Sequence, residues 1–412
     1  MGKILALAFC LIGILFRSSC GAAAGEQQAE FPHLLVISQG AKDYGDPVYR
    51  QQLARHDVVI LGLWRGWGNI RDLVVRLKRI NPKLLVGQYT ILNESNDDPK
   101  NGTIEDVVYK LNRENWWLRK ADGSRVQWTS AYGTWDINIT EWTKPDFNGQ
   151  RYPEWLAQRD YRVFFEPVPE FDIWFFDNVM VFPRIAAADW DGDGKDENGK
   201  DPRIQEAYRR GQVAHWEKAR ALAPNMIVMG NADGDLSTKE YRGRLNGDFL
   251  EAMMGKAWSP ETLQGWDGMM SRYHTVFDNL LPPKLVAFNV AGKIADYRFF
   301  RYAYASCLLD DGYFSFSDDD AGRGVVPWFD EYEVRLGKAI DPPQKAPWRN
   351  GVYRRLFANG MALVNPTDKP IMLTLGEGWR RLSGRQDPQT NDGQPVTALT
   401  IPPRDAVVLI KP

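Results

Sequence analysis

Short runs of apolar residues alternate with amphipathic segments over most of the chain. Residues 171–180, which read FDIWFFDNVM, form one such run between Pro169 and Pro183. A short apolar run rich in aromatic residues is typical of a strand buried on both faces, and such strands belong mostly to parallel sheets. The same pattern predicts further strands at residues 31–38, 57–64, 83–90, 225–233, 247–255, 284–290 and 312–318.

The amphipathic segments between these runs predict helices. The clearest covers residues 70–80, where apolar residues recur at helical spacing and Asn81-Pro82 ends the pattern. Other helices are expected at residues 48–55, 152–165, 202–222, 259–281 and 297–309. Between residues 91 and 166 the pattern weakens, and before the helix at 152–165 we expect long loops that include residues 116–126 and 134–140.

Eight strands with helices between them predict an α/β fold, a (β/α)8 TIM barrel over residues 31–330. The rival fold, a doubly wound open sheet, would favour a Gly-rich phosphate loop after the first strand, and QGAKDYG lacks that spacing. Residues 348–412 show short alternating runs with turns, which indicate a small antiparallel β domain of the sandwich type. Residues 331–347, with three prolines, are the expected linker.

The first residues resemble a secretory signal. Lys3 precedes an apolar run at residues 4–16, and small residues follow up to Ala24. The run is too short to span a bilayer comfortably. We therefore expect residues 1–24 to be removed, and the mature protein to be secreted or periplasmic in a bacterium, without a transmembrane segment. Lipid attachment at Cys20 is the alternative, although Arg17 stands where a lipoprotein signal has an aliphatic residue.

Composition narrows the class of protein further. The chain has 412 residues, 44% of them hydrophobic and 25% charged, which is ordinary for a globular protein. Its formal net charge of −2 provides no basic surface for nucleic acid. Once the leader is removed, Cys307 has no cysteine to pair with, and a buried, inert thiol is expected. We expect a monomer.

Carboxylates and amides gather where the predicted strands end. The carboxyl ends of barrel strands carry the active site, and Asp177 and Glu251 lie at the ends of the fourth and sixth strands. No His lies at a strand end, which disfavours a His-based triad or a multi-His metal centre. Paired carboxylates suit hydrolysis of a glycosidic bond. Further substrate-binding candidates, polar residues at strand ends and aromatic residues for stacking on sugar rings, are Asp43, Trp64, Arg65, Tyr89, Asn178, Asn231, Asp318 and Trp328.

The two carboxylates are expected to have different roles. Asp177 is followed by Asn178, whose amide can hydrogen-bond a sugar hydroxyl or keep the carboxylate ionised, and Asp177 is the expected nucleophile or electrostatic base. Glu251 lies among Phe249, Leu250 and two methionines, and an apolar setting favours a protonated general acid. The structural alternatives are a turn-capping role for Asp177 and a solvated strand-edge carboxylate for Glu251.

Several segments together resemble a known group of families. These are FDIWFFDNV, MGNAD, DFLEAM, YFSFSDDD and the tail from FANGMALVNPTD to AVVLI. They resemble the bacterial hypothetical glycosyl hydrolases, which are related to the barrel clan of endo-α-1,4-polygalactosaminidase and the α-galactosidases. The resemblance covers nearly the whole mature chain, and the Asp of the fourth strand is its most specific element. It implies acids at the positions of Asp177 and Glu251 and leaves the sugar open.

An acidic loop, DWDGDGKDENGKD, is a candidate calcium site. Asp189, Asp191 and Asp193 occupy the first, third and fifth positions of an EF-type loop. The twelfth position is Lys200 where that motif has Glu, so the full pattern fails. The alternative is a solvated acidic loop, and no cofactor is required for the expected chemistry.

Two other function classes compete with the secreted hydrolase of a poly- or oligosaccharide. A catalytically inactive carbohydrate-binding barrel would need stacking rings and one polar anchor, whereas this chain has carboxylates at two strand ends. A metal-dependent hydrolase or deacetylase would need His ligands at strand ends, which are missing.

Overall fold

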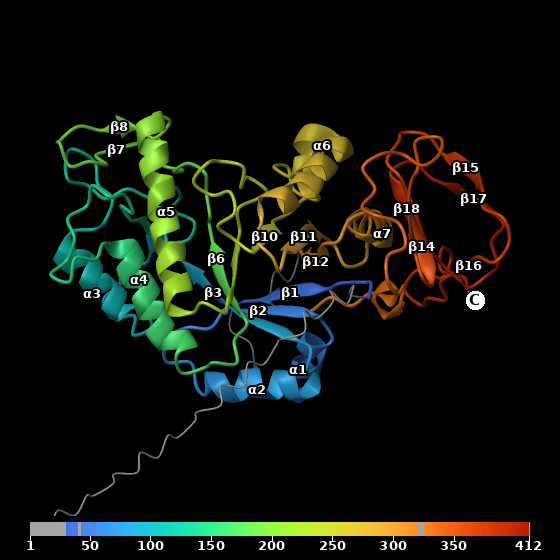
Figure 1. The fold of residues 1–412 in the computed structure, drawn as a ribbon, viewed down its shortest axis with the longest axis horizontal. Coiled ribbons are helices and arrows are strands. Elements are labelled where there is room, and N and C mark those ends of the chain that lie inside the picture. Colours follow the sequence, from blue (N-terminus) through green and yellow to red (C-terminus); the bar gives the residue numbers. More distant parts are fainter. Residues whose placement is uncertain (1–29, 40–42, 320–324, 412) are drawn as a thin grey trace, which may run out of the picture.

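Eight parallel strands form one sheet in the order β1-β2-β3-β6-β9-β10-β11-β12 in the computed structural model, which describes residues 30–39, 43–319 and 325–411. A parallel bridge between Leu34 and Phe314 joins the two edges of this sheet, so the strands close into a barrel (Figure 1). The predicted TIM-barrel fold is confirmed. The strands are β1 (Leu35–Ser38), β2 (Val58–Leu61), β3 (Leu85–Ile91), β6 (Ile173–Asp177), β9 (Ile227–Gly230), β10 (Gly247–Leu250), β11 (Leu285–Gly292) and β12 (Tyr313–Asp318).

Helices cover the outside of the barrel, close to the segments that the sequence predicts. Asp46 and Asp201 begin two of them by accepting a hydrogen bond from a backbone N–H two residues further on, and a proline follows each. Residues 231–246, between β9 and β10, contain no helix. The helices are α1 (Pro47–Ala54), α2 (Ile70–Ile80), α4 (Tyr152–Asp160) with the π-helix η1 (Tyr161–Phe165), α5 (Pro202–Leu222), α6 (Pro260–Val276) with η2 (Phe277–Asn279), α7 (Tyr297–Cys307) and η3 (Asp330–Glu333).

The two-residue period of the strands fills the barrel interior. In β6, Ile173 and Phe175 pack with inward side chains of the other strands, whereas Trp174 and Phe176 pack in the layer beneath the helices. Asp177 continues the inward series at the carboxyl end of β6. Asn231 likewise follows Ile227 and Met229 at a spacing of two. The alternation therefore places these polar side chains at the mouth of the barrel, above an apolar plug.

An insertion between β3 and β6 forms a second core, and here one prediction is wrong. The stretch of expected loops before the helix at 152–165 contains a helix, α3 (Glu105–Glu114), whose Val107, Val108 and Leu111 are buried. The helix is short, and six of its ten residues are charged or amide-bearing, so its apolar period is weak in the sequence. This core packs beside the short pairs β4 (Glu94–Ser95) with β5 (Trp135–Asp136) and β7 (Ala187–Ala188) with β8 (Glu197–Asn198).

The C-terminal residues form antiparallel sheets that pack on α7 (Figure 1). The contact contains a buried ion-pair group, because Arg301 of α7 pairs with Asp405 at 2.9 Å and with Asp387 at 2.6 Å. One sheet contains β13 (Tyr353–Phe357), β14 (Gly360–Asn365), β18 (Asp405–Ile410) and β16 (Arg380–Arg381), and the other contains β15 (Ile371–Thr374) and β17 (Ala398–Ile401).

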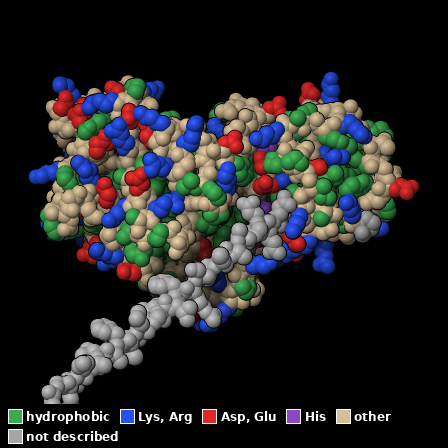
Figure 2. Space-filling model, viewed as in Figure 1, with side chains coloured by type: hydrophobic (Ala, Val, Ile, Leu, Met, Phe, Trp, Pro, Cys, Tyr) green, Lys and Arg blue, Asp and Glu red, His purple; other side chains and the backbone are tan. Residues whose placement is uncertain are grey.

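Positive and negative side chains are interspersed over the face of the molecule drawn in Figure 2. Within the described ranges, no helix is both long and apolar enough to cross a membrane. The predicted leader, with Cys20, lies outside the described residues.

Candidate active site

A cavity of about 800 Å³ opens at the carboxyl ends of the central barrel strands. Four strands or their ends contribute to it: Tyr89 from β3, Asp177 from β6, Asn231 after β9 and Glu251 after β10. Their inward register on neighbouring strands explains why residues far apart in the sequence meet here. The other lining residues are Gln39, Ile91, Glu94, Trp128, Tyr132, Asn178, Met180, Arg184, Asp233 and Trp258.

Both oxygens of the Asp177 carboxylate accept hydrogen bonds. Oδ1 accepts one from the Asn178 backbone N–H and one from Asn231 Nδ2, each at 2.9 Å, and Oδ2 accepts one from the Tyr89 hydroxyl. Asn178 has a φ of 53°, a left-handed conformation that Asn tolerates better than most residues. The carboxylate is therefore fixed in orientation at the barrel mouth.

The side chain of Asn231 links the two carboxylates that the sequence predicts to be catalytic. Its Nδ2 donates to Asp177 Oδ1 at 2.9 Å and to Glu251 Oε2 at 2.8 Å. The distance between these two oxygens therefore cannot exceed the sum of the two hydrogen-bond lengths. Retaining glycosidases hold their carboxyl groups about 5–5.5 Å apart, and inverting enzymes about 6.5–9.5 Å. The bridge fits the shorter separation.

Asp233 adds a third carboxyl group beside Glu251. Burial raises the pKa of Asp233 to about 6, the charge of Arg272 opposes this shift, and repulsion from Glu251 adds to it. Arg272 holds the residue in place through a hydrogen bond to its carbonyl at 2.8 Å and a contact with Oδ2 at 3.1 Å. This carboxyl group of the cavity wall is therefore easier to protonate than an ordinary aspartate.

A further carboxylate pair, Glu94 and Asp136, lies in the insertion next to the cavity. The two residues face each other across β4 and β5, and Trp128 donates its indole N–H to Glu94 at 2.5 Å and its backbone N–H to Asp136 at 2.9 Å. Burial raises the pKa of Asp136 to about 7, with a smaller contribution from the charge of Glu94. This pair fixes Trp128 in the cavity wall.

Replacing Asp136 with asparagine is expected to weaken the pH dependence of stability. Between about pH 4 and pH 7 the folded state keeps a proton that the unfolded state has released, so the free energy of unfolding falls as the pH rises through this range. Urea unfolding at about pH 5 and about pH 8 should give a smaller difference for Asp136→Asn than for the wild type. The exposed Asp98→Asn is the control, and equal differences in all three proteins would contradict the assignment.

Aromatic side chains form the rim of the cavity. Trp258 is 53% exposed and Tyr132 is 67% exposed, and the rings of Trp128 and Tyr132 lie 5.7 Å apart. The guanidinium of Arg184 lies 4.3 Å from the ring centre of Trp128 and donates to Asn178 at 2.9 Å. Large exposed rings beside a polar cavity offer flat apolar surfaces for sugar rings.

Residues 78–361, most of the chain, match the hypothetical glycosyl hydrolase family 15. The chain belongs to this family. Membership places it among the glycoside hydrolases, as the sequence predicts. No curated protein matches the sequence.

Solved structures of glycoside hydrolases are similar to this family 15 protein. An alpha-amylase from Anoxybacillus has a TM-score of 0.50 and 9% identity, over 92% of this chain and 98% of that chain. Amy13B of Eubacterium rectale has a TM-score of 0.51 and 8% identity, over 92% and 94%. The glycoside hydrolase domain of PelA from Pseudomonas aeruginosa has a TM-score of 0.46 and 13% identity, over 72% and 97%. At such low identity, the first two likenesses support the fold alone.

The structure of the family 15 chain brings half of the predicted site residues together. Tyr89, Asp177, Asn178, Asn231 and Glu251 line one cavity. Tyr89, Asp177, Asn231 and Glu251 continue the inward-facing series of their strands. Asn178 lies in the turn directly after β6.

The other substrate-binding candidates lie outside this cavity. Asp43 is exposed and accepts a hydrogen bond from the Gly45 backbone N–H, and Arg65 pairs with Asp106 of the unpredicted helix α3 at 2.9 Å. Asp318 shares the outward register of Phe316 on β12. Their positions at strand ends or in the following loops are close to those predicted, but their side chains point elsewhere.

Two of the three aromatic residues predicted to stack on sugar also lie elsewhere. Trp64 packs edge-on against Trp67, with ring centres 4.2 Å apart. Trp328 lies under the guanidinium of Arg55, 3.5 Å from its ring centre, and next to His56, near the amino end of β2 and therefore at the opposite end of the barrel. The position in the cavity that the sequence predicts for Trp64 and Trp328 is filled by three other aromatic residues. These are Trp128, Tyr132 and Trp258, which lie in loops with no periodic signal.

The acidic loop brings its carboxylates together. Asp189, Asp191, Asp193 and Glu197 each offer an oxygen, and these oxygens all lie within 4.8 Å of one another. Carboxylate oxygens are the ligands that calcium prefers. Arg203 pairs with Asp191 at 2.8 Å, and Lys195 pairs with Asp193 at 3.1 Å, so protein cations already neutralise part of this charge. Glu197, absent from the predicted set, completes the group.

Proposed function

We propose that this family 15 protein hydrolyses a glycosidic bond of a poly- or oligosaccharide with retention of anomeric configuration. The observation that carries the proposal is the Asn231 bridge, which holds Asp177 and Glu251 at a separation suited to direct attack on the anomeric carbon. The same pair argues against a catalytically inactive carbohydrate-binding barrel, since binding alone does not need two facing carboxylates.

In the proposed reaction, Asp177 attacks the anomeric carbon and forms a covalent glycosyl–enzyme, while Glu251 gives a proton to the departing oxygen. Water, deprotonated by Glu251, then attacks the anomeric carbon and breaks its bond to Asp177, which frees the sugar and leaves Asp177 ionised and Glu251 protonated. Three hydrogen-bond donors orient Asp177 for attack. Asn231 donates to both carboxylates and keeps them apart in a fixed geometry.

The charge of the cavity narrows the substrate class. Carboxyl groups of Glu94, Asp177, Asp233 and Glu251 face it, and Arg184 is the cation among its described lining residues. Such a lining disfavours acidic polymers, because uronic acids or sulfate groups would be repelled. We infer a neutral or amino-sugar polymer, whose rings stack on the aromatic rim.

The proposal is tested by assaying reducing ends released from soluble starch, galactomannan, partly N-acetylated polygalactosamine and polygalacturonate. We expect hydrolysis of at least one of the first three and none of polygalacturonate. Proton NMR of the fresh product should show the anomeric configuration of the substrate. Inversion would contradict the short carboxyl separation, and hydrolysis of polygalacturonate would contradict the charge argument.

Calcium binding at the acidic loop remains a prediction. If the loop binds calcium, the melting temperature should rise by a few degrees at a calcium concentration about 100-fold above the dissociation constant. Asp189→Ala, which removes one ligand, should abolish the rise, and magnesium should not reproduce it. Equal melting temperatures with and without calcium, and no heat on titration, would identify a solvated acidic loop.

We also propose that the protein acts outside the cytoplasm, as the predicted leader at residues 1–24 indicates. The mass of the protein recovered from the periplasm or the culture medium of a bacterial host should match a chain that begins after residue 22 or residue 24. Full-length protein confined to the cytoplasm would contradict this.

A further inference from the structure

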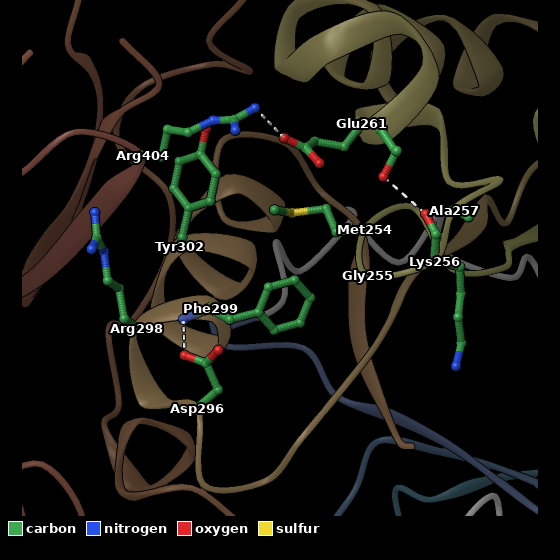
Figure 3. Close-up of a pocket in the computed structure, with 11 residues that line it drawn as sticks. Met254, Gly255, Lys256, Ala257, Glu261, Asp296, Arg298, Phe299, Tyr302 and Arg404 are labelled. Atoms are coloured by element: carbon green, nitrogen blue, oxygen red, sulfur yellow. Dashed lines mark hydrogen bonds and ion pairs between the residues drawn. The ribbon is translucent and has the colours of Figure 1, made fainter. Parts of the chain in front are cut away.

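A second cavity, of about 510 Å³, lies between the barrel and the C-terminal sheets (Figure 3). The residues after β10 form one side, and the start of α6 and the first half of α7 form two others. Arg404, in the turn before β18, covers it from the C-terminal part of the chain. None of these residues has a part in the proposed reaction.

The hydroxyl of Tyr302 is the most informative group in this cavity. Tyr302 rises from α7 toward the Arg404 side chain (Figure 3), is 4% exposed, and its hydroxyl has no hydrogen-bond partner among the described residues. A buried hydroxyl without a partner is unfavourable, and it can both donate and accept. The cavity wall therefore contains a hydroxyl group whose hydrogen-bonding capacity the described residues leave unused.

Four of the five charged side chains that line the cavity already have a charged partner. Arg404 donates to Glu261 at 2.8 Å (Figure 3), and Lys256 pairs with Asp319 at 2.5 Å. Arg298 lies 3.6 Å from Asp405. An anion would have to compete with these carboxylates, whereas an uncharged ligand with several hydroxyl groups can donate to them and accept from the guanidinium groups.

Apolar surface completes the cavity. Met254 and the ring of Phe299 face each other in Figure 3, below the level of Arg404 and Glu261. A hexose has the matching form, with an apolar C–H face and hydroxyl groups around its edge. An aromatic ring with polar groups around it suits such a ligand better than it suits a lipid or an inorganic ion.

One loop forms part of the wall of both cavities. Glu251 and Trp258 line the active-site cavity, and residues 254–257 between them line the second cavity. Gly255 fixes the loop on the barrel, because its φ is 101° and a Cβ there would lie 1.6 Å from the carbonyl oxygen of Ala291. The two cavities therefore adjoin the same loop.

We propose that the second cavity is an accessory saccharide subsite that binds a neutral hexose unit of the same polysaccharide chain. The identity of the polymer as a substrate rests on the proposed function, but binding at this cavity does not require hydrolysis. A subsite at this position holds a chain that extends beyond the bond being cleaved, which favours long chains over short oligosaccharides and cleavage within the chain over cleavage at its end.

The test combines two variants with a matched control. Thr262→Arg places a long side chain at the exposed edge of the cavity, and Tyr302→Phe removes only the orphan hydroxyl. Gln264→Arg makes the same charge change on the exposed part of α6 outside the cavity. Retardation is measured by electrophoresis through gels that contain soluble starch, galactomannan or partly N-acetylated polygalactosamine, and kcat/KM is measured on the same polymers and on a short aryl glycoside.

We expect both cavity variants to bind the retarding polymer several-fold more weakly and to lose kcat/KM on it by a similar factor. Their kcat/KM on the aryl glycoside, and all values for Gln264→Arg, should match the wild type. If both cavity variants bind the polymer as tightly as the wild type does, the subsite proposal is wrong. It is also wrong if the wild type binds none of the polymers. A wild type that is retarded but cleaves nothing, with retardation weakened in both variants, would overturn the proposed function and leave the subsite in place.

Discussion

Asp177→Asn is expected to lower kcat/KM on every substrate by on the order of 10⁴-fold or more, because the amide cannot form the glycosyl–enzyme. The loss should be equally severe for a polymer and for an aryl glycoside with a good leaving group, since both need the nucleophile. Asparagine has nearly the shape of aspartate, and Tyr89 and Asn231 remain as neighbours, so the fold should be kept. Steady-state kinetics measure the loss of activity, and a thermal melt of the same preparation shows whether the fold is kept.

Asp43→Asn is the matched control, because the sequence places Asp43 at a strand end and the structure places it on an exposed turn outside the cavity. Its activity should remain within about twofold of the wild type. Activity of Asp177→Asn near that of Asp43→Asn would remove Asp177 from the reaction.

Glu251→Gln is expected to separate substrates by their leaving groups. On a polymer, whose departing oxygen needs a proton, activity should fall by roughly 10²–10⁴-fold. On a dinitrophenyl glycoside, which leaves without a proton, glycosylation should stay close to the wild-type rate. Added azide should rescue turnover, because it attacks the glycosyl–enzyme without a general base, and the product should be a glycosyl azide of retained configuration.

Glu166→Gln, an exposed carboxyl outside both cavities, is the control for Glu251→Gln and should leave both substrates unaffected. The reverse pattern, with Asp177→Asn sensitive to the leaving group and Glu251→Gln inactive on all substrates, would exchange the two roles. An equal loss on both substrates without azide rescue would instead point to a structural role for Glu251. Asp233, whose pKa lies at about 6, would then be the acid to examine.

The strands of the barrel could be predicted because they are buried on both faces. Few polar residues therefore interrupt the apolar runs by which they are recognised in the sequence. The chain from Ile173 to Phe176 is fully buried, and the polar character begins at Asp177, where the strand ends. A rule about strand ends is sufficient to find Asp177 and Glu251. It does not say which way a side chain points, and Asp318 fails for this reason, since it is one residue out of the inward register.

The rim of the cavity could not be predicted in the same way. Trp128 is placed by Glu94 and Asp136, a contact that depends on how an insertion of irregular chain folds back on the barrel. Aromatic content alone does not distinguish Trp128 from Trp328, which packs against Arg55 at the far end of the barrel. The helix α3 illustrates the same limit, because its few apolar positions matter only once a second core exists for them to join.

The ion-pair group of Arg301 limits how far the chain of this enzyme can be shortened. A fragment cut back to the barrel would lack Asp387 and Asp405 and would expose the apolar side of α7 together with an uncompensated guanidinium. Breaking a buried ion pair from one side costs roughly 3–5 kcal/mol, a large share of the roughly 5–15 kcal/mol that keeps a domain folded. We therefore expect the barrel alone to lose a large part of its stability, and engineering that transplants it into another protein should carry its C-terminal sheets along.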